Sequence, residues 1–242
     1  MGEPKSLILS YIFIMKISKF VPAFLKPALG SIYRRFFLKP DHGSKKSRES
    51  LHAYWTDPYD GENPPEAYAV NHDSSELLVD LANKYSSADS RFLEIGCNVG
   101  RNLNYLHSAG YKNLNAVEIN PNAVKLLKET FPDMAKSATI HNAPVENVIK
   151  TFGDDEFDVV YSLAVLEHIH KDSEWIFGEM VRISKQYIIT IEDEHGRSWR
   201  HFPRNYKKVF TSIGMQQIEE RHCKDINTLD ENFFARVFRK KV

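Results

Sequence analysis

Residues 92–102, FLEIGCNVGRN, bring together the residue types that build a nucleotide pocket. An apolar run ends in an acid and Gly96, and a second glycine, Gly100, closes a tight turn before a helical pattern starts. The first N–H groups of a helix attract a ligand, and glycine lets that ligand approach the backbone. Asn98 stands where a third glycine is expected, and asparagine also tolerates left-handed dihedral angles. The segment predicts a strand, a ligand-binding turn and a helix.

Two common nucleotide-binding turns do not fit this segment. The dinucleotide fingerprint needs glycines at its first, third and sixth positions, where this chain has Gly96, Asn98 and Arg101. The phosphate loop of nucleotide triphosphatases needs Gly-Lys followed by Ser or Thr, and no such triplet follows. The pattern that remains is E-x-G-x-N-x-G, from Glu94 to Gly100.

Three further segments carry polar residues at the ends of predicted strands. Residues 114–119, LNAVEI, contain Glu118, whose carboxylate can accept hydrogen bonds from both hydroxyls of a ribose. A third strand ends at Asn142 and is followed by Ala143, and an Asn side chain can both donate and accept hydrogen bonds. Residues 157–169, FDVVYSLAVLEHI, predict a buried strand that runs into a polar loop.

In this order and spacing, the four segments resemble the class I S-adenosylmethionine-dependent methyltransferases, whose first motif is usually D/E-x-G-x-G-x-G. The resemblance covers roughly residues 90–242 and implies an α/β fold, a doubly wound sheet of seven strands with helices on both faces. The family's strand order is 3-2-1-4-5-7-6, with strand 7 antiparallel. The resemblance also implies S-adenosylmethionine as the cofactor, held by Glu94, Gly96, Cys97, Asn98, Gly100, Asn102, Glu118, Ile119, Asn142, Ala143, Ser162 and Leu163.

Methyl transfer from a sulfonium is an in-line displacement, so the protein must align the acceptor with the methyl group and exclude water. An alcohol acceptor usually needs a general base, whereas an amine needs only to be neutral. Ligands of open α/β sheets bind beyond the carboxyl ends of the strands, which places the candidates after the fourth and fifth strands. The preferred base is His195, directly beyond the fifth strand, and the alternatives are His201 and His168.

The loop after the fifth strand is rich in other charged residues. Arg197, Arg200 and Arg204 could hold an acidic acceptor through bidentate contacts, or they could simply be solvated. Residues 192–195 could chelate a metal ion, but consecutive residues rarely converge on one ion. No metal is therefore expected.

Strand and helix patterns alternate along most of the chain, which favours a parallel sheet with right-handed crossovers. The predicted strands are 91–95, 114–119, 138–142, 157–163 and 186–192. The predicted helices are 71–85, 100–109, 121–131, 172–184 and 203–213. Two closing strands, 215–223 and 232–239, follow without a helix between them, and in the family such a hairpin supplies the antiparallel strand.

Composition limits the compartment and the partners. Two cysteines in 242 residues are too few for a disulfide framework, which fits a reducing, cytoplasmic location. Residues 1–50 contain ten Lys or Arg against three Asp or Glu, so the rest of this neutral chain is acidic. An acidic catalytic part argues against a nucleic-acid partner, which needs a basic track along the binding face.

The chain divides into three predicted parts. Residues 1–50 form a basic, apolar extension whose last part, 41–50, is a polar linker. Residues 51–88 form a cap over the cofactor site, and residues 89–242 form the methyltransferase domain. Aromatic residues of the cap either wall the site against water or seal its first helix to the sheet. They are Tyr54, Trp55, Tyr59 and Tyr68.

Residues 15–37 pair large apolar side chains with lysine and arginine and predict one or two amphipathic helices. Two roles stay open for them. One is peripheral contact with anionic lipid at the inner face of the membrane. The other is packing on the domain or on the second subunit of a homodimer. The apolar run 7–17 is too short to span a bilayer, which takes about 20 residues.

These patterns together predict a methyltransferase that acts on a small-molecule acceptor. The basic, apolar extension resembles that of methyltransferases that act on saccharides or lipid-linked intermediates, and this resemblance implies a hydroxyl of such a compound as the acceptor. Two alternatives stay open, a non-catalytic cofactor-binding scaffold or regulator with the same fold and a methyltransferase that modifies proteins or peptides.

Overall fold

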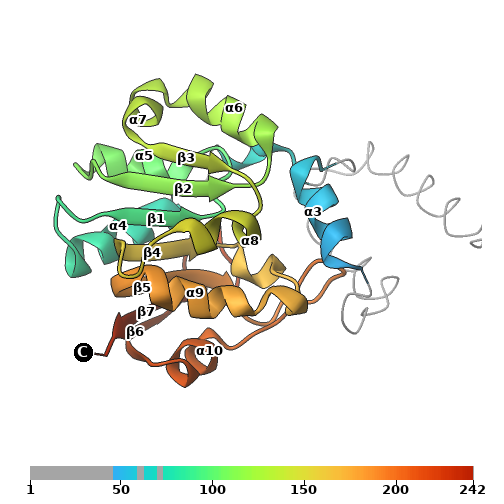
Figure 1. Cartoon of the computed structure of the whole chain (residues 1–242), viewed down its shortest axis with the longest axis vertical. Helices are drawn as coiled ribbons and strands as arrows, with labels where there is room; N and C mark the ends of the chain where they lie inside the picture. The colour runs from blue at the N-terminus through green and yellow to red at the C-terminus, as the bar shows by residue number, and fades with distance from the viewer. Residues whose placement is uncertain (1–45, 59–62, 70–72, 242) are drawn as a thin grey trace, which may run out of the picture. The chain divides into compact units, whose positions relative to one another are not determined.

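Seven strands form one sheet in the order β3-β2-β1-β4-β5-β7-β6 (Figure 1), which confirms the predicted fold. The computed structural model describes residues 46–58, 63–69 and 73–241. The predictions for the extension before residue 46, including segment 15–37, and for Tyr59 lie outside these residues. None of the described helices is long and apolar enough to cross a membrane.

Parallel strands make the centre of the sheet, and an antiparallel pair closes it. The parallel strands are β1 (Phe92–Ile95), β2 (Leu114–Glu118), β3 (Thr139–Asn142), β4 (Phe157–Leu163) and β5 (Ser184–Asp193). The closing pair is β6 (Met215–His222) and β7 (Phe233–Lys240), and β7 runs antiparallel to β5. In the middle, Glu94 of β1 lies opposite Ala116 of β2 and Tyr161 of β4. The carboxyl ends of these strands therefore bring the predicted motifs to one edge.

Helices cover both faces of the sheet, as the resemblance implied. One apolar layer joins the sheet to α4 (Asp73–Tyr85), α5 (Arg101–Ser108), α6 (Pro121–Thr130) and α7 (Pro132–Ser137). The other joins it to α8 (Val145–Val148), η3 (Ile149–Thr151), α9 (Trp175–Ile183) and α10 (Tyr206–Ser212). Successive residues of a strand pack into different layers, because their side chains point to opposite faces of the sheet. Phe92 belongs to the first layer and Leu93 to the second.

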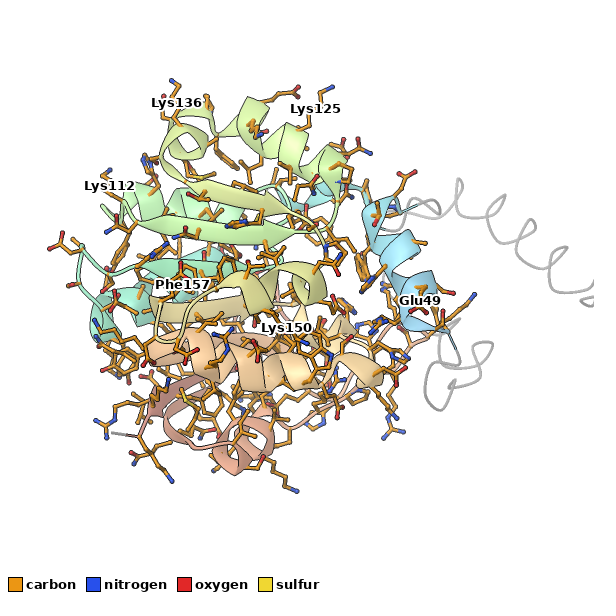
Figure 2. All side chains as sticks on the ribbon, viewed as in Figure 1. Glu49, Lys112, Lys125, Lys136, Lys150 and Phe157 are labelled. Atoms are coloured by element: carbon orange, nitrogen blue, oxygen red, sulfur yellow. The ribbon has the colours of Figure 1, made fainter. Side chains whose placement is uncertain are left out.

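Local sequence signals fix several helix starts. The side chain of Asn120 accepts hydrogen bonds from the N–H groups of Asn122 and Ala123, and Pro121 occupies the first turn of α6. Asn205 caps α10 in the same way, through the N–H of Lys208. Away from the core, Figure 2 shows Lys125 on α6 pointing away from the sheet, as expected of the solvent side of an amphipathic helix.

The structure differs from the predicted elements mainly before the sheet. Helix α3 (Arg48–Thr56) begins inside the stretch 41–50 that was expected to be a linker, because the side chain of Ser47 accepts from the N–H of Ser50. A short helix, η2 (Pro65–Tyr68), follows it. Two further short helices, η4 (Leu166–His168) and η5 (Lys171–Ser173), occupy the connection after β4, so α9 starts at Trp175 rather than at residue 172.

Candidate functional site

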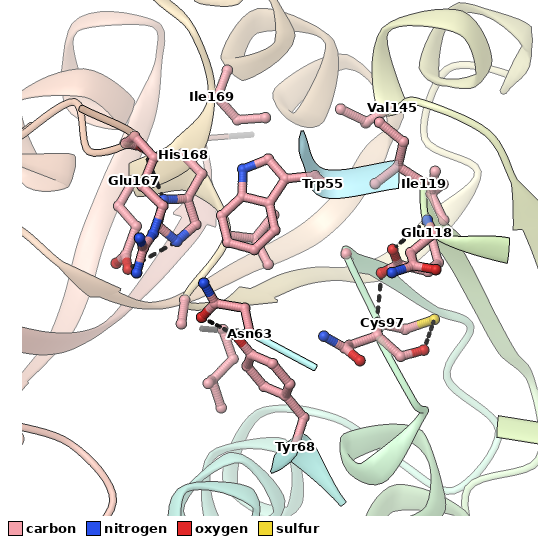
Figure 3. A pocket seen from close by; sticks show the side chains of 18 of the residues that line it. Trp55, Asn63, Tyr68, Cys97, Glu118, Ile119, Val145, Glu167, His168 and Ile169 are labelled. Atoms are coloured by element: carbon pink, nitrogen blue, oxygen red, sulfur yellow. Dashed lines mark hydrogen bonds and ion pairs between the residues drawn. The ribbon is translucent and has the colours of Figure 1, made fainter. Parts of the chain in front are cut away.

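A cavity of about 360 Å³ opens beyond the carboxyl ends of β1, β2 and β4 (Figure 3). Its volume lies within the range of small-molecule pockets, about 300–1,000 Å³. The turn after β1, the end of β2, the segments after β3 and β4, and side chains of α3 and η2 line it. The cavity therefore lies at the edge of the sheet where the strand topology predicted ligand binding.

The turn after β1 takes the left-handed backbone that the motif predicts. Gly96, Asn98 and Gly100 have φ angles of 74°, 47° and 73°. A Cβ on Gly96 would lie 2.6 Å from a methyl group of Val165, so this glycine lets the loop after β4 pack on the turn. A Cβ on Gly100 would likewise lie 2.6 Å from Leu127. Both glycines are thus required for packing within the protein, besides their backbone angles.

Glu94 supports the turn from beneath. Its carboxylate is fully buried and accepts hydrogen bonds from Asn102 Nδ2 at 2.7 Å and from the hydroxyl of Tyr161 at 3.0 Å. Burial raises the pKa of this carboxyl to about 7. The side chain links β1 to the start of α5 and to β4, and it does not line the cavity.

Glu118 faces the cavity at the end of β2 (Figure 3). One carboxylate oxygen accepts the N–H of Asn98 and the other accepts the N–H of Asn120, each at 2.7 Å. Burial raises the pKa of this carboxyl, and the two backbone N–H groups oppose that rise. The carboxylate is therefore held rigidly between the glycine-rich turn and the start of α6.

The structure brings most of the predicted cofactor residues together. Those that line the cavity are Gly96, Cys97, Asn98, Asn102, Glu118, Ile119, Ala143 and Leu163. Those outside its lining are Glu94, Gly100, Asn142 and Ser162. Asn142 is exposed, and its Nδ2 donates to the carbonyl of Glu118 at 2.8 Å. Asn142 therefore links β3 to β2 and does not face the cavity with its amide.

Aromatic side chains from the segment before the sheet wall the cavity. Trp55 and Tyr68 line it, as one of the two sequence-based alternatives expected. Tyr54 instead lies buried behind them, with its ring edge-on to Trp55 at 5.0 Å and to Trp199 at 4.8 Å. Arg101 holds the wall in place, because its Nη1 donates to the carbonyl of Tyr68 at 2.9 Å.

The opposite wall carries two of the three candidate bases, together with a glutamate that the sequence analysis gave no role. Glu167, His168 and His201 all line the cavity, and their potential ligand atoms lie within 4.8 Å of one another. Glu167 Oε1 is 3.5 Å from His168 Nε2 and 3.7 Å from His201 Nε2. Burial raises the pKa of Glu167 to about 8 and lowers that of His168 to about 3. Burial also lowers the pKa of His201.

Two buried side chains, Glu192 and Arg204, hold the short helix η4 that presents Glu167 and His168. Glu192 Oε2 accepts the N–H groups of Val165 at 2.9 Å and Leu166 at 3.0 Å. From the other side, Arg204 donates to the carbonyls of Leu166 at 3.1 Å and Ile169 at 2.8 Å. The N–H groups at the start of η4 thus meet a carboxyl oxygen, and the carbonyls near its end meet a guanidinium. These contacts fix the direction of the side chains that η4 carries.

His195, the preferred base, does not reach the cavity. It is exposed, and its ring lies edge-on to Phe234 at 5.9 Å. Of the three arginines considered for the acceptor, Arg200 lines the cavity, Arg197 is exposed and Arg204 is engaged with η4. The structure therefore does not place the His195 side chain toward the cavity, contrary to the expectation. Asp193 Oδ1 accepts the N–H groups of His195 and Gly196, and this turn directs the chain away from the cavity.

Comparisons with known proteins agree with this geometry. A family model described as a methyltransferase domain matches residues 93–187. None of the curated protein sequences compared with the chain matches it.

Several solved structures share the fold. An S-adenosylmethionine dependent methyltransferase from Mesorhizobium loti has 13% identity and a TM-score of 0.54, over 69% of this chain and 98% of that one. One from Archaeoglobus fulgidus has 15% identity and a TM-score of 0.54, over 69% and 94%. The 1,6-didemethyltoxoflavin-N1-methyltransferase of Burkholderia thailandensis, solved with 1,6-didemethyltoxoflavin and S-adenosylhomocysteine, has 12% identity and a TM-score of 0.59, over 81% and 87%.

At these identities the solved structures show the fold, and the family model shows a methyltransferase domain over residues 93–187. The sheet order, the glycine-rich turn and the acid at the end of β2 agree with such a domain. Residues 93–187 are therefore a methyltransferase domain, and the sheet has the fold of S-adenosylmethionine-dependent methyltransferases, so the chain is an enzyme with S-adenosylmethionine as its cofactor.

Proposed function

We propose that the protein transfers the methyl group of S-adenosylmethionine to a hydroxyl oxygen of a small-molecule acceptor. The observation that supports this proposal is one cavity with two chemically different ends. Glu118 and the glycine-rich turn line one end, and Glu167 with His168 lines the other, with Trp55 between them (Figure 3). A cofactor seated at the first end extends its methyl group toward the second.

The first end offers the groups that a nucleoside needs. Each oxygen of Glu118 accepts one backbone N–H and keeps a lone pair for a ribose hydroxyl. Ile119 and Val145 lie beside it (Figure 3) and give apolar surfaces for an adenine ring. We assign the cofactor to the lining residues Gly96, Cys97, Asn98, Asn102, Glu118, Ile119, Ala143 and Leu163. Glu94, Gly100 and Asn142 then act indirectly, by holding these residues in place.

The second end favours an oxygen acceptor over an amine. A hydroxyl has to lose its proton before or during methyl transfer, whereas a neutral amine already has a free lone pair. His168 donates its Nδ1 proton to the carbonyl of Arg200, because a carbonyl can only accept, so its Nε2 keeps a lone pair. That lone pair, the Nε2 of His201 and Glu167 lie together at this end.

The walls between the two ends suit a ring-shaped acceptor. Trp55 and Tyr68 present aromatic surfaces to the cavity, and Trp55 rests on the ring of His168 with 4.6 Å between centroids. The indole Nε1 of Trp55 is buried and has no hydrogen-bond partner among the described residues, so it can donate to a ligand. A saccharide or a phenol fits these groups, which supports the acceptor class proposed from the sequence.

The first experiment separates cofactor binding from acceptor chemistry. Calorimetry with S-adenosylhomocysteine should show one site per chain, and Glu118→Ala should weaken it. A panel of saccharides, phenols and amines is then tested for formation of S-adenosylhomocysteine from S-adenosylmethionine. We expect turnover with hydroxyl acceptors. Turnover restricted to amines would contradict the oxygen assignment, and a lack of cofactor binding would contradict the whole proposal.

A pair of histidine variants tests the acceptor end. His201→Gln should lower turnover by about 100-fold or more, in the range of lost proton-transfer catalysis, and keep the affinity for S-adenosylhomocysteine. His195→Gln is the matched control, because His195 is on the same loop but outside the lining. Equal turnover in the two variants would contradict the placement of the acceptor.

A further inference from the structure

Three potential ligand atoms converge on one point of the cavity wall. Glu167 Oε1 lies 3.5 Å from His168 Nε2 and 3.7 Å from His201 Nε2. These distances exceed those of hydrogen bonds, so the three groups face one another without bonding directly. An ion bonded at about 2.1 Å to oxygen and nitrogen ligands separates those ligands by about 3.0–3.4 Å. A small adjustment of the side chains therefore seats a cation between them.

The far side of each group is already held, as metal ligands require. His168 Nδ1 lies 3.0 Å from the carbonyl of Arg200, and His201 Nδ1 lies 2.5 Å from Ser198 Oγ. The second oxygen of Glu167 accepts the N–H of Asp193 at 2.5 Å. Metal-bound histidines almost always have such a partner on the other ring nitrogen, which fixes the ring and the tautomer.

The backbone that carries the three groups is also fixed from several directions. Glu192 and Arg204 hold the two ends of η4. In addition, the N–H of Phe202 donates to the carbonyl of Glu167 at 2.7 Å, which ties the loop of His201 to η4. Residues from two separate connections are thus positioned before any ligand arrives, as a preorganised site needs.

We propose that Glu167, His168 and His201 bind one divalent transition-metal ion in a two-histidine, one-carboxylate site. Imidazole donors suit Zn²⁺ or Mn²⁺ better than Mg²⁺, which prefers oxygen ligands and water. All three residues line the cavity, so the remaining coordination positions of the ion face it. No metal was expected from the sequence, and no local ligand spacing marks this site, since Glu167 and His168 are 33 residues or more away from His201.

The role of this ion rests on the proposed function, and because the Nε2 atoms of His168 and His201 are its ligands, the ion replaces a free imidazole base in activating the acceptor. The ion binds the acceptor oxygen and lowers its pKa, as a bound metal does for water. The acceptor O–H bond then breaks and its proton passes to solvent. The oxygen forms a bond to the methyl carbon while the sulfur–carbon bond breaks, and neutral S-adenosylhomocysteine leaves.

Metal binding is tested on the full chain without a histidine tag, stripped by a chelator and dialysed. Titration with Zn²⁺ in a calorimeter should show one site per chain, and Mg²⁺ should bind more weakly. His168→Gln and His201→Gln should each weaken Zn²⁺ binding by at least about 10-fold, and Ser198→Ala, which removes the partner of His201, by about 10-fold. His195→Gln should bind Zn²⁺ like the unmodified chain.

Each variant is also titrated with S-adenosylhomocysteine, so that loss of metal binding is distinguished from loss of the fold. The assignment is overturned if the unmodified chain does not bind Zn²⁺, or if the variants that retain S-adenosylhomocysteine binding also bind Zn²⁺ undiminished. Failure of the proposed function gives a different result, Zn²⁺ binding without cofactor binding or turnover. Chelated enzyme should lose turnover with a hydroxyl acceptor and regain it with Zn²⁺ or Mn²⁺, and undiminished turnover after chelation would overturn the role of the ion.

Discussion

Replacing Glu94 by glutamine should make the protein more stable at alkaline pH. The carboxyl is fully buried, and its pKa rises from the usual 4.5 to about 7. At 1.36 kcal/mol per pKa unit, keeping this group ionised in the folded state costs about 3 kcal/mol. Gln keeps both contacts, because its carbonyl can accept from Asn102 and its amide can donate to the oxygen of Tyr161.

The sign of the pH dependence follows from which state holds the proton. Below pH 4.5 both states hold it, so Glu94 adds no pH dependence. Between pH 4.5 and 7 the folded state holds a proton that the unfolded state has lost, so stability falls as the pH rises. Above pH 7 the loss is complete. The stability of Glu94→Gln relative to the unmodified protein should therefore increase by about 2 kcal/mol between pH 5.5 and pH 8.5.

Urea unfolding at the two pH values measures this difference. Taking the variant relative to the unmodified protein at each pH removes the contributions of other buried acids, such as Glu167. Glu129→Gln is the control, because Glu129 is exposed and its ion pair with Lys125 is 3.9 Å long, so little change is expected. A difference that is constant with pH, or that shrinks at pH 8.5, would refute the reasoning and show an ionised, stabilising carboxylate.

Three more substitutions test other contacts. Glu118→Gln places an amide nitrogen against a backbone N–H and should weaken S-adenosylhomocysteine binding by about 10–100-fold in calorimetry. Unchanged affinity would reject the assignment of Glu118 to the cofactor. Gly96→Ala should lower the free energy of unfolding in urea by about 2–4 kcal/mol, because the added methyl collides with Val165 and the backbone has a left-handed φ. Unchanged stability would show that the loop of Val165 moves aside without cost. Arg204→Met removes the donors to the carbonyls of η4 and should cost about 2–4 kcal/mol by the same method, unless those carbonyls find other donors.

The sheet could be predicted because its signals are local. The central strands β1, β2 and β4 contain short apolar runs that are followed by a polar residue or a turn, and β1 illustrates this with Phe92 to Ile95 followed by a left-handed glycine. Helix α3 could not be predicted in the same way. Its first residues, Arg48 and Glu49, are polar like those of a linker. Its buried residues are Leu51 and Tyr54, and Tyr54 packs on Trp199, which is distant in the sequence.

The acceptor end could be predicted only in part, for a similar reason. His195 and His201 share one loop, and only the turn made by Asp193 decides that the first points outward. Glu167 received no separate role, because a buried carboxylate in a helical turn looks like any other acid in a sequence. Its position opposite two imidazoles depends on contacts between the connections after β4 and β5. Such contacts cannot be predicted from a local sequence pattern.

Trp55 gives this enzyme a built-in optical reporter. Its indole lies between the two ends of the cavity and rests on His168 (Figure 3). Indole fluorescence depends on the polarity and the quenchers around the ring, and a protonated or metal-bound imidazole quenches differently from a neutral one. The other two tryptophans differ in setting, since Trp175 lies on the surface beside Lys150 and Trp199 packs on Tyr54. Emission from the Trp175→Phe protein can therefore follow cofactor, acceptor and cation arrival in real time, in stopped flow, without any label.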